Sequence, residues 1–274
     1  MKNIILIIKG FFMGIANIIP GVSGGTLAIT MNIYERLINT INHFFKDIKS
    51  NIKFLSLLGI GILIALALGS NVITYSLDKY PLPTIMFFTG LILGGVPMLF
   101  NKIKTNINIK NMLVFILTFT FIILIMFLKT NSDVSLDNLN ITSYIKLFAV
   151  GLVAAATMIV PGISGSFMLM VMGYYEPIIN TIKELTSFNN IVNNIIILIP
   201  FGLGILAGFI ILAKLLEFLF KKYEVITYFG IIGFVLASLI GIFIETVFVF
   251  SIASFVVGII LLIIGFGIAY KLGD

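Results

Sequence analysis

The sequence predicts an all-α polytopic membrane protein built from two related halves. Hydrophobic residues occupy 60% of the 274 positions and charged residues only 10%, and the mean hydropathy is +1.20. A Pro-Gly-x-Ser-Gly motif also occurs twice. A soluble domain carries about 25% charged residues, so a water-soluble fold could not cover this much apolar surface.

Long uncharged stretches indicate membrane-spanning helices. Leu113 to Leu128 and Val247 to Tyr270 contain no charged residue and are about as long as a helix needs to cross the hydrocarbon core. The alternation of period two that marks barrel strands is absent. Because only helices or closed barrels satisfy backbone polar groups in lipid, we expect transmembrane helices.

The chain contains an internal duplication. A shift of 141 positions (161 minus 20) places Pro20 to Gly24 on Pro161 to Gly165 without a gap. The same shift places Ile38 to Ile41 on the identical tetrapeptide Ile179 to Ile182. Chance is a poor explanation, so both halves are predicted to share one architecture.

Each half is expected to contain a re-entrant helical hairpin followed by three transmembrane helices. Each returning segment, Thr26 to Ile41 or Phe167 to Ile182, would reach only about 20 to 25 Å, less than the core thickness of about 30 Å. Three crossings would invert the second half relative to the first, as in many secondary transporters. The first repeat is predicted at residues 1–130, with its hairpin at 4–41 and spans at about 54–76, 83–100 and 112–128; the second is predicted at 131–274, with its hairpin at 145–182 and spans at about 193–220, 225–244 and 247–270.

Lysine placement predicts the orientation. If the hairpins are re-entrant, the side of the membrane that holds the N-terminus carries ten lysines and three acidic residues, and the other side carries four lysines and five acidic residues. Lysine excess marks cytoplasmic loops, so both termini are expected in the cytoplasm, in an inner membrane. The net charge of +6 is interpreted in the same way, and no nucleic-acid partner is expected. The ten lysines are Lys2, Lys46, Lys49, Lys53, Lys102, Lys104, Lys110, Lys221, Lys222 and Lys271.

The two Pro-Gly turns predict an anion site. Each turn starts a helix whose first N–H groups lack partners, and such ends attract phosphate or carboxylate. Hydroxyl donors follow in both turns: Ser23 and Thr26 in the first, Ser164 and Ser166 in the second. The alternative is that the glycines only permit close helix packing and the hydroxyls only cap their own helices. The duplication favours the functional interpretation.

Ionisable and amide side chains near the turns are further candidates. Glu35 and Glu176 lie at the far ends of the returning segments, where an ionisable group in or near lipid is functional by default. Arg36 has no basic counterpart in the second half and could clamp a phosphate; a surface pair with Glu35 is the alternative. Asn17 and Thr157 precede the prolines and could line the same cavity, or bond between helices.

The candidate substrate-binding residues come from both halves and include the backbone of each turn. They are Asn17, Gly21, Ser23, Gly24, Gly25, Thr26, Glu35, Arg36, Thr157, Gly162, Ser164, Gly165, Ser166 and Glu176.

The remaining charged residues are interpreted as structural, and the sequence lacks the usual catalytic motifs. Lys214 and Glu217 are spaced as an intrahelical ion pair, and His43, the only histidine, is expected at the membrane interface. The chain has no cysteine, no HExxH motif and no P-loop ending. No catalytic residue, metal or cofactor is therefore predicted.

One family shares these motifs. The stretch Gly10 to Thr26, continued by Ile33 to Leu37, together with Pro161 to Ser166 and Tyr175 to Pro177, resembles the bacterial polyprenyl-phosphate transporter family, formerly a domain of unknown function. The resemblance spans essentially the whole chain. Many members of that family carry an acidic residue where this chain has Asn17, which argues against proton coupling at this position.

The resemblance implies a lipid-phosphate flippase. Such a protein would move undecaprenyl phosphate, the C55 lipid carrier, from the outer to the inner leaflet for reuse in peptidoglycan and surface-glycan synthesis. The tail would stay in the bilayer while the phosphate crosses a polar site. A transporter or channel for a small soluble anion is the alternative. Coupling to a proton or sodium gradient and the oligomeric state stay open.

Overall fold

The computed structural model describes residues 2–19, 22–104, 107–128, 134–136 and 140–273. These residues are almost entirely helical, and six of their helices are long and apolar enough to cross a membrane, in agreement with a polytopic membrane protein. The elements are α1 (Lys2–Ala16), α2 (Gly24–Thr30), α3 (Tyr34–Asn42), α4 (Ile48–Ile64), the π-helical turn η1 (Ala65–Gly69), α5 (Ser70–Lys79), α6 (Pro81–Ile103), α7 (Ile109–Met126), α8 (Ile141–Ile159), α9 (Gly165–Val171), α10 (Tyr175–Thr186), α11 (Ile191–Glu245) and α12 (Ile252–Gly273).

Short polar residues between the apolar runs start several of these helices. Asp47 before α4, Asn108 before α7 and Asn140 before α8 each accept a backbone N–H from the following turn. Pro81 opens α6, where its missing N–H would have had no helical partner. Local sequence therefore accounts for where these helices begin.

Helix α11 consists of two segments that meet at Tyr223, where φ is −134° and ψ is 44°. Its 55 residues measure about 80 Å at 1.5 Å per residue, more than twice the core thickness of about 30 Å. The bend lies between the spans predicted at 193–220 and 225–244. The two segments together are thus long enough for two crossings.

Both returning segments are broken into two short helices. The segment predicted as one helix at Thr26 to Ile41 forms α2 and α3, and Asn32 between them has a φ of 56°. The segment predicted at Phe167 to Ile182 forms α9 and α10, and Gly173 between them has a φ of 75°. Asn and Gly are the residues that most readily adopt this left-handed conformation. The expected reach of about 20 to 25 Å assumed helical rise along each whole segment, and this assumption was wrong because one left-handed residue does not disturb the hydrophobic pattern.

Equivalent glycines hold equivalent helix pairs together. A Cβ at Gly61 of α4 would overlap the backbone oxygen of Ile7 in α1. Likewise, a Cβ at Gly204 of α11 would overlap the backbone oxygen of Phe148 in α8. The partners are related by shifts of 143 (204 minus 61) and 141 (148 minus 7). Since only glycine allows so close a backbone approach, the same helix contact is made twice.

Each half also supplies a helix that packs on the other half. Helix α12 packs along α6, and α7 packs along α11. Gly265 of α12 lies against the backbone of Phe87 in α6, and Gly233 of α11 lies against the backbone of Phe115 in α7. Helix α6, which packs on α12, α11 and α2, has the largest buried share of the six long helices.

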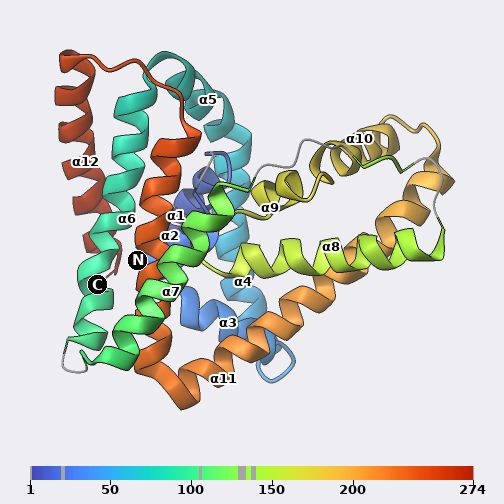
Figure 1. Cartoon of the computed structure of the whole chain (residues 1–274), viewed down its shortest axis with the longest axis horizontal. Coiled ribbons are helices and arrows are strands. Elements are labelled where there is room, and N and C mark those ends of the chain that lie inside the picture. Colours follow the sequence, from blue (N-terminus) through green and yellow to red (C-terminus); the bar gives the residue numbers. More distant parts are fainter. Residues whose placement is uncertain (1, 20–21, 105–106, 129–133, 137–139, 274) are drawn as a thin grey trace.

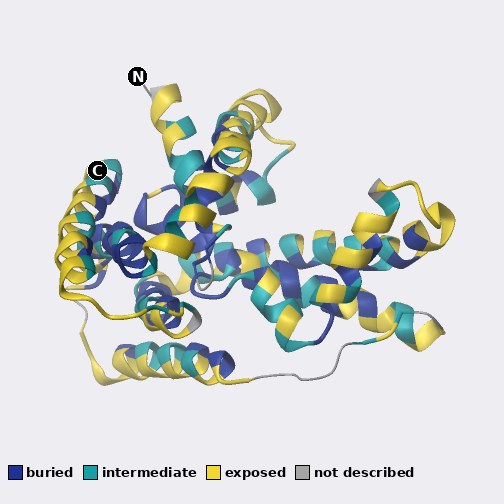
Figure 2. Cartoon of the chain, turned by 90° about the horizontal axis from the view of Figure 1, so that it is seen from above, coloured by how far each residue is buried: buried dark blue, intermediate teal, exposed yellow. Residues whose placement is uncertain are grey.

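The molecule divides into a body and an arm (Figure 1). The body consists of α1 to α7, α12 and the second segment of α11; the arm consists of α8, α9, α10 and the first segment of α11. Seen from above, the arm extends to one side and buried residues are most concentrated in the body (Figure 2). The two hairpins therefore belong to different regions, with the first in the body and the second on the arm.

Candidate functional site

The two Pro-Gly turns contact each other. The Gly162 N–H of the second turn donates to Thr26 Oγ1 of the first at 3.0 Å. The Tyr34 hydroxyl donates to the Ile159 backbone oxygen at 2.9 Å, which satisfies one of the carbonyls that lack a helical partner at the end of α8. A Cβ at Gly25 would stand 3.0 Å from that same oxygen. The two turns therefore lie together, and backbone groups make much of the contact between them.

Ser23 and Ser164 cap the helices that follow them. Ser23 Oγ accepts the Thr26 N–H, and Ser164 Oγ accepts the Phe167 N–H, each at 3.1 Å. The capping alternative therefore holds at both positions. Each serine hydroxyl also bonds a neighbouring hydroxyl, Ser23 Oγ with Thr26 Oγ1 at 3.0 Å and Ser164 Oγ with Ser166 Oγ at 3.1 Å, and either oxygen of a pair can be the donor. One hydroxyl proton of each pair is not used between the two, so capping does not exclude a second role.

A cavity of about 500 Å³ lies beside the two turns, and we call it the tip cavity. Its polar wall comes from both hairpins, and its apolar wall comes from α1, α3, α4 and α11 together with the end of α8. The polar wall consists of Asn17, Ser23, Gly24, Gly25, Tyr34, Ser164, Gly165 and Ser166. The apolar wall consists of Met13, Leu37, Ile38, Ile41, Leu55, Leu58, Gly59, Ile62, Met158, Ile159 and Phe209.

A second cavity, also of about 500 Å³, adjoins the same turns. It shares Asn17, Ser164 and Ser166 with the tip cavity and continues along α9 to Tyr175. The three shared residues are therefore accessible from both cavities. Asn17 is held there by its own turn, because its Oδ1 accepts the Gly24 N–H at 3.2 Å.

The tip cavity offers hydrogen-bond donors without charge. None of its lining residues is ionised at neutral pH, so no carboxylate repels an anion and no cation attracts one. Hydroxyl, amide and backbone N–H donors can bind phosphate oxygens, and such bonds are stronger in surroundings of low dielectric. The lining also lacks a carboxylate or histidine to act as general base. Across the described residues, no group of three or more His, Cys, Asp or Glu side chains is placed to hold a metal ion.

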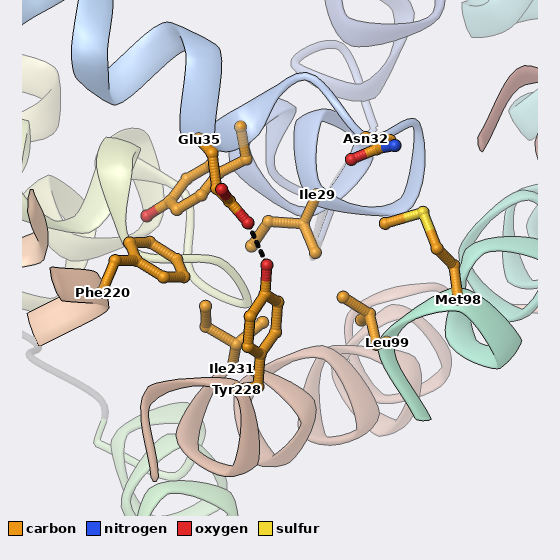
Figure 3. Close-up of a pocket in the computed structure, with 9 residues that line it drawn as sticks. Ile29, Asn32, Glu35, Met98, Leu99, Phe220, Tyr228 and Ile231 are labelled. Atoms are coloured by element: carbon orange, nitrogen blue, oxygen red, sulfur yellow. Dashed lines mark hydrogen bonds between the residues drawn. The ribbon is translucent and has the colours of Figure 1, made fainter. Parts of the chain in front are cut away.

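Glu35 and Arg36 lie on α3 but do not line the tip cavity. The Tyr228 hydroxyl donates to the Glu35 carboxylate beside a cavity of about 20 Å³ (Figure 3), which has room for one water molecule. The Arg36 guanidinium carbon lies 4.5 Å from the centre of the Phe54 ring, in a cation–π contact. In the described part of the chain, these two neighbours therefore have separate partners and do not form the surface pair considered above.

Three other candidates are also placed away from the tip cavity or cannot be placed. The Thr157 hydroxyl donates to the Ala154 backbone oxygen of its own helix at 2.9 Å. Glu176 lines a different cavity of about 480 Å³ on the arm, together with Glu184 and several asparagines. Gly21 lies outside the described residues.

Some lining residues were missed although the repeat contains a signal for them. The shift of 141 pairs Asn17 with Met158, not with Thr157, and Met158 lines the tip cavity. The same shift pairs Tyr34 with Tyr175, and one lines the tip cavity while the other lines the second cavity. Position within the repeat was thus a better guide than polarity.

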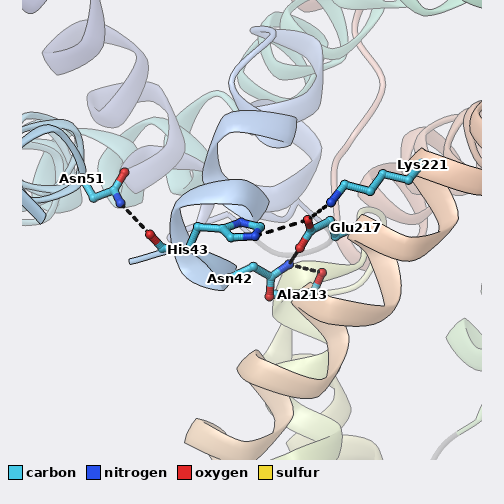
Figure 4. Close-up of polar contacts among 6 residues, drawn as sticks. All are labelled: Asn42, His43, Asn51, Ala213, Glu217 and Lys221. Atoms are coloured by element: carbon cyan, nitrogen blue, oxygen red, sulfur yellow. Dashed lines mark hydrogen bonds and ion pairs between the residues drawn. The ribbon is translucent and has the colours of Figure 1, made fainter. Parts of the chain in front are cut away.

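The end of the first hairpin is attached to α11 by a polar cluster (Figure 4). Asn42 Nδ2 donates to Glu217 Oε2 at 2.7 Å, and His43 Nε2 lies 3.6 Å from Glu217 Oε1. The same carboxylate pairs with Lys221, so the predicted pair of Glu217 with Lys214 was wrong. A Glu four residues before a Lys is the favourable order on a helix, which explains the choice of partner.

Comparison with known proteins identifies relatives that align over most of this chain. It is 35% identical over 274 residues to the polyprenyl-phosphate transporter of Staphylococcus aureus (strain NCTC 8325 / PS 47), an alignment that covers 97% of this chain and 95% of the relative. It is 29% identical over 246 residues to the polyprenyl-phosphate transporter of Vibrio cholerae serotype O1 (strain ATCC 39315 / El Tor Inaba N16961), with 85% of this chain and 75% of the relative covered.

No solved structure matches the chain. The family described as undecaprenyl phosphate translocase-like matches residues 13–254. The chain therefore belongs to the undecaprenyl phosphate translocase-like family.

Proposed function

We propose that this protein carries undecaprenyl phosphate across the bacterial cytoplasmic membrane, from the outer to the inner leaflet, for reuse in cell-envelope synthesis. The observation that carries the proposal is the tip cavity, where both Pro-Gly turns present uncharged donors beside an apolar wall. A phosphate attached to a hydrocarbon chain needs both kinds of surface. The names of two relatives, each a polyprenyl-phosphate transporter, support the same substrate class.

In this proposal the two halves are inverted repeats with re-entrant hairpins, and both termini lie in the cytoplasm. The matched packing of Gly61 and Gly204 and the breaks at Asn32 and Gly173 support a structural repeat. The crossed packing of α12 on α6 and α7 on α11 is what a pseudo-two-fold relation would produce. The lysine bias supports the orientation.

The phosphate binds at the turns through neutral donors. Ser23, Ser164 and Ser166 supply hydroxyls, and Asn17 supplies an amide. A neutral site binds the anion through hydrogen bonds alone, without an ion pair. This suits a carrier, which must also release its substrate. Arg36, which packs on Phe54, acts outside this site.

Access alternates between the tip cavity and the second cavity. Both cavities reach Asn17, Ser164 and Ser166, so one phosphate position can serve either route. The bonds from Gly162 to Thr26 and from Tyr34 to Ile159 hold the turns together in the present arrangement. If a proton or sodium gradient drives transport, its coupling group lies outside the tip cavity, whose lining has no carboxylate.

Transport in liposomes tests this function. Purified protein is reconstituted with labelled undecaprenyl phosphate in one leaflet, and exchange between leaflets is followed with a membrane-impermeant phosphate reagent. We expect faster exchange than in protein-free liposomes, with chemically unchanged lipid recovered by mass spectrometry. Folded protein that gives no acceleration contradicts the proposal, and altered lipid indicates an enzyme.

A transporter or channel for a small soluble anion is the second candidate, because the polar wall alone would accept inorganic phosphate. The adjoining apolar wall favours the lipid. Liposomes loaded with radiolabelled inorganic phosphate separate the two: release of the ion through the protein, without exchange of the lipid, supports the soluble anion.

A further inference from the structure

We propose that the apolar wall of the tip cavity binds the first isoprene units of the lipid, with the face of α4 around Gly59 as the floor of this subsite. The proposal rests on the proposed function and adds the residues that recognise the hydrocarbon chain. It makes the tip cavity a two-part site in which one wall takes the phosphate and the other takes the start of the tail.

The helical spacing of the wall supports a continuous apolar surface. Leu55, Leu58, Gly59 and Ile62 of α4 all line the tip cavity, and their spacing of i, i+3, i+4 and i+7 puts them on one helix face. Leu37, Ile38 and Ile41 line it from α3, and Phe209 from α11. This surface begins beside the turns, so a lipid bound there by its phosphate would lay its first apolar carbons against it.

The size of the cavity limits how much of the lipid it can hold. Its volume is about 500 Å³, within the range of about 300 to 1,000 Å³ that accommodates a drug-sized ligand. That is enough for a phosphate and a few isoprene units, and far too little for a C55 chain. Leu37, Ile41 and Ile62 are only partly buried, so the wall is not sealed and the rest of the chain can continue into the bilayer.

Gly59 differs from the glycines that hold helices together. A Cβ built on Gly59 would meet no heavy atom within 4 Å, whereas a Cβ on Gly61 would overlap the backbone of α1. Packing therefore does not require glycine at position 59. The missing side chain leaves space on the cavity wall, and a larger residue would take up that space.

The second half provides a matched position outside the tip cavity. Gly202 is equivalent to Gly59 at a shift of 143 (202 minus 59), and a Cβ there also meets no heavy atom within 4 Å. Both glycines are partly buried within long apolar helices, but Gly202 does not line the tip cavity. The same substitution at either position changes helix propensity and apolar surface in the same way. Only the substitution at Gly59 fills the tip cavity.

The test compares Gly59→Leu with Gly202→Leu. Binding of undecaprenyl phosphate to purified protein in detergent and its exchange in liposomes are measured for both variants and for the unmodified chain. We expect Gly59→Leu to weaken binding and slow exchange about tenfold or more, since displacing several buried methylene groups costs at least that factor. Gly202→Leu should stay within about twofold of the unmodified protein.

The outcomes separate the subsite from the function. If the unmodified protein neither binds nor exchanges the lipid, the proposed function fails. If it does both and Gly59→Leu matches it, the subsite proposal is overturned while the function stands. Equal losses in both leucine variants also overturn it, because the effect then follows the helix surface and not the cavity. Gly59→Ala, which adds only a Cβ, should keep most of the activity and so distinguishes filling of the cavity from loss of glycine.

Discussion

The two hairpins share one motif but lie in different surroundings. Every residue of α2 is buried, and Ser23 before it is 2% exposed. In the equivalent helix α9 only Gly165 is buried, and Met170 is 50% exposed. The reason lies in the neighbours: α2 packs on α1, α6 and α8, whereas α9 packs chiefly on α8 and α10 of its own half. Sequence similarity within a repeat therefore does not imply equal burial.

This difference identifies the element that is easier to move. The first hairpin is enclosed by the body, and its end is attached to α11 through Glu217. The second hairpin is on the arm and touches the first through a few bonds at its turn, such as that from Gly162 to Thr26. An element with few buried contacts opens at a lower free-energy cost. We expect the second hairpin to move against the first during transport.

The largest effect is expected where the two halves are most alike. Gly61→Ala and Gly204→Ala each push a Cβ into a facing backbone oxygen, and each should lower the free energy of unfolding in mixed micelles by about 1 to 3 kcal/mol. Gly59→Ala and Gly202→Ala are the controls, since a Cβ there meets no heavy atom within 4 Å. If only one of Gly61→Ala and Gly204→Ala lowers the free energy of unfolding, the two helix contacts are not structurally equivalent.

The next effect concerns the bond between the turns. Thr26→Val keeps the shape of a fully buried side chain but leaves the Gly162 N–H without its acceptor. The expected loss is about 1 to 3 kcal/mol in the free energy of unfolding. Ser166→Ala removes an exposed hydroxyl and should stay within about 0.5 kcal/mol. Similar losses in both variants would contradict the difference in environment between the hairpins.

The two capping serines allow a direct comparison. Ser23→Ala and Ser164→Ala each remove a cap, worth about 1 kcal/mol of stability, and we expect the greater loss at the more buried Ser23. Both should also slow lipid exchange in liposomes, since both residues line the tip cavity. Ser164→Thr retains a capping hydroxyl and serves as control. Normal exchange in both alanine variants would show that the hydroxyls do not bind phosphate.

The smallest effect is expected at the anchor of the first hairpin. Lys221 pairs with Glu217, but its side chain is 71% exposed, so Lys221→Met should cost only about 0.2 to 1 kcal/mol. Lys214→Met is the matched control and should cost less. Chemical denaturation at low and high salt checks this, because salt screens the pair. A cost that persists at high salt would mean that packing, and not charge, holds the anchor.

Much of the architecture was predictable from local sequence. Long uncharged runs predict membrane helices because the bilayer core requires a fixed apolar length, and caps such as Asn140 mark where helices begin. The repeat predicts which residues are equivalent. It also indicates that Met158, and not the polar Thr157, is the residue equivalent to Asn17.

The sequence by itself determined the membrane class, the duplication and the two Pro-Gly turns, because hydrophobicity, repeated motifs and turn chemistry are local properties. Only the tertiary structure decided which residues share the tip cavity, because that depends on contacts between segments far apart in the chain, such as Ser23 and Ser164. Contact also decided that Arg36 faces Phe54 and that one hairpin is enclosed while the other is exposed. Two copies of one motif acquired different surroundings because each packs against different neighbours.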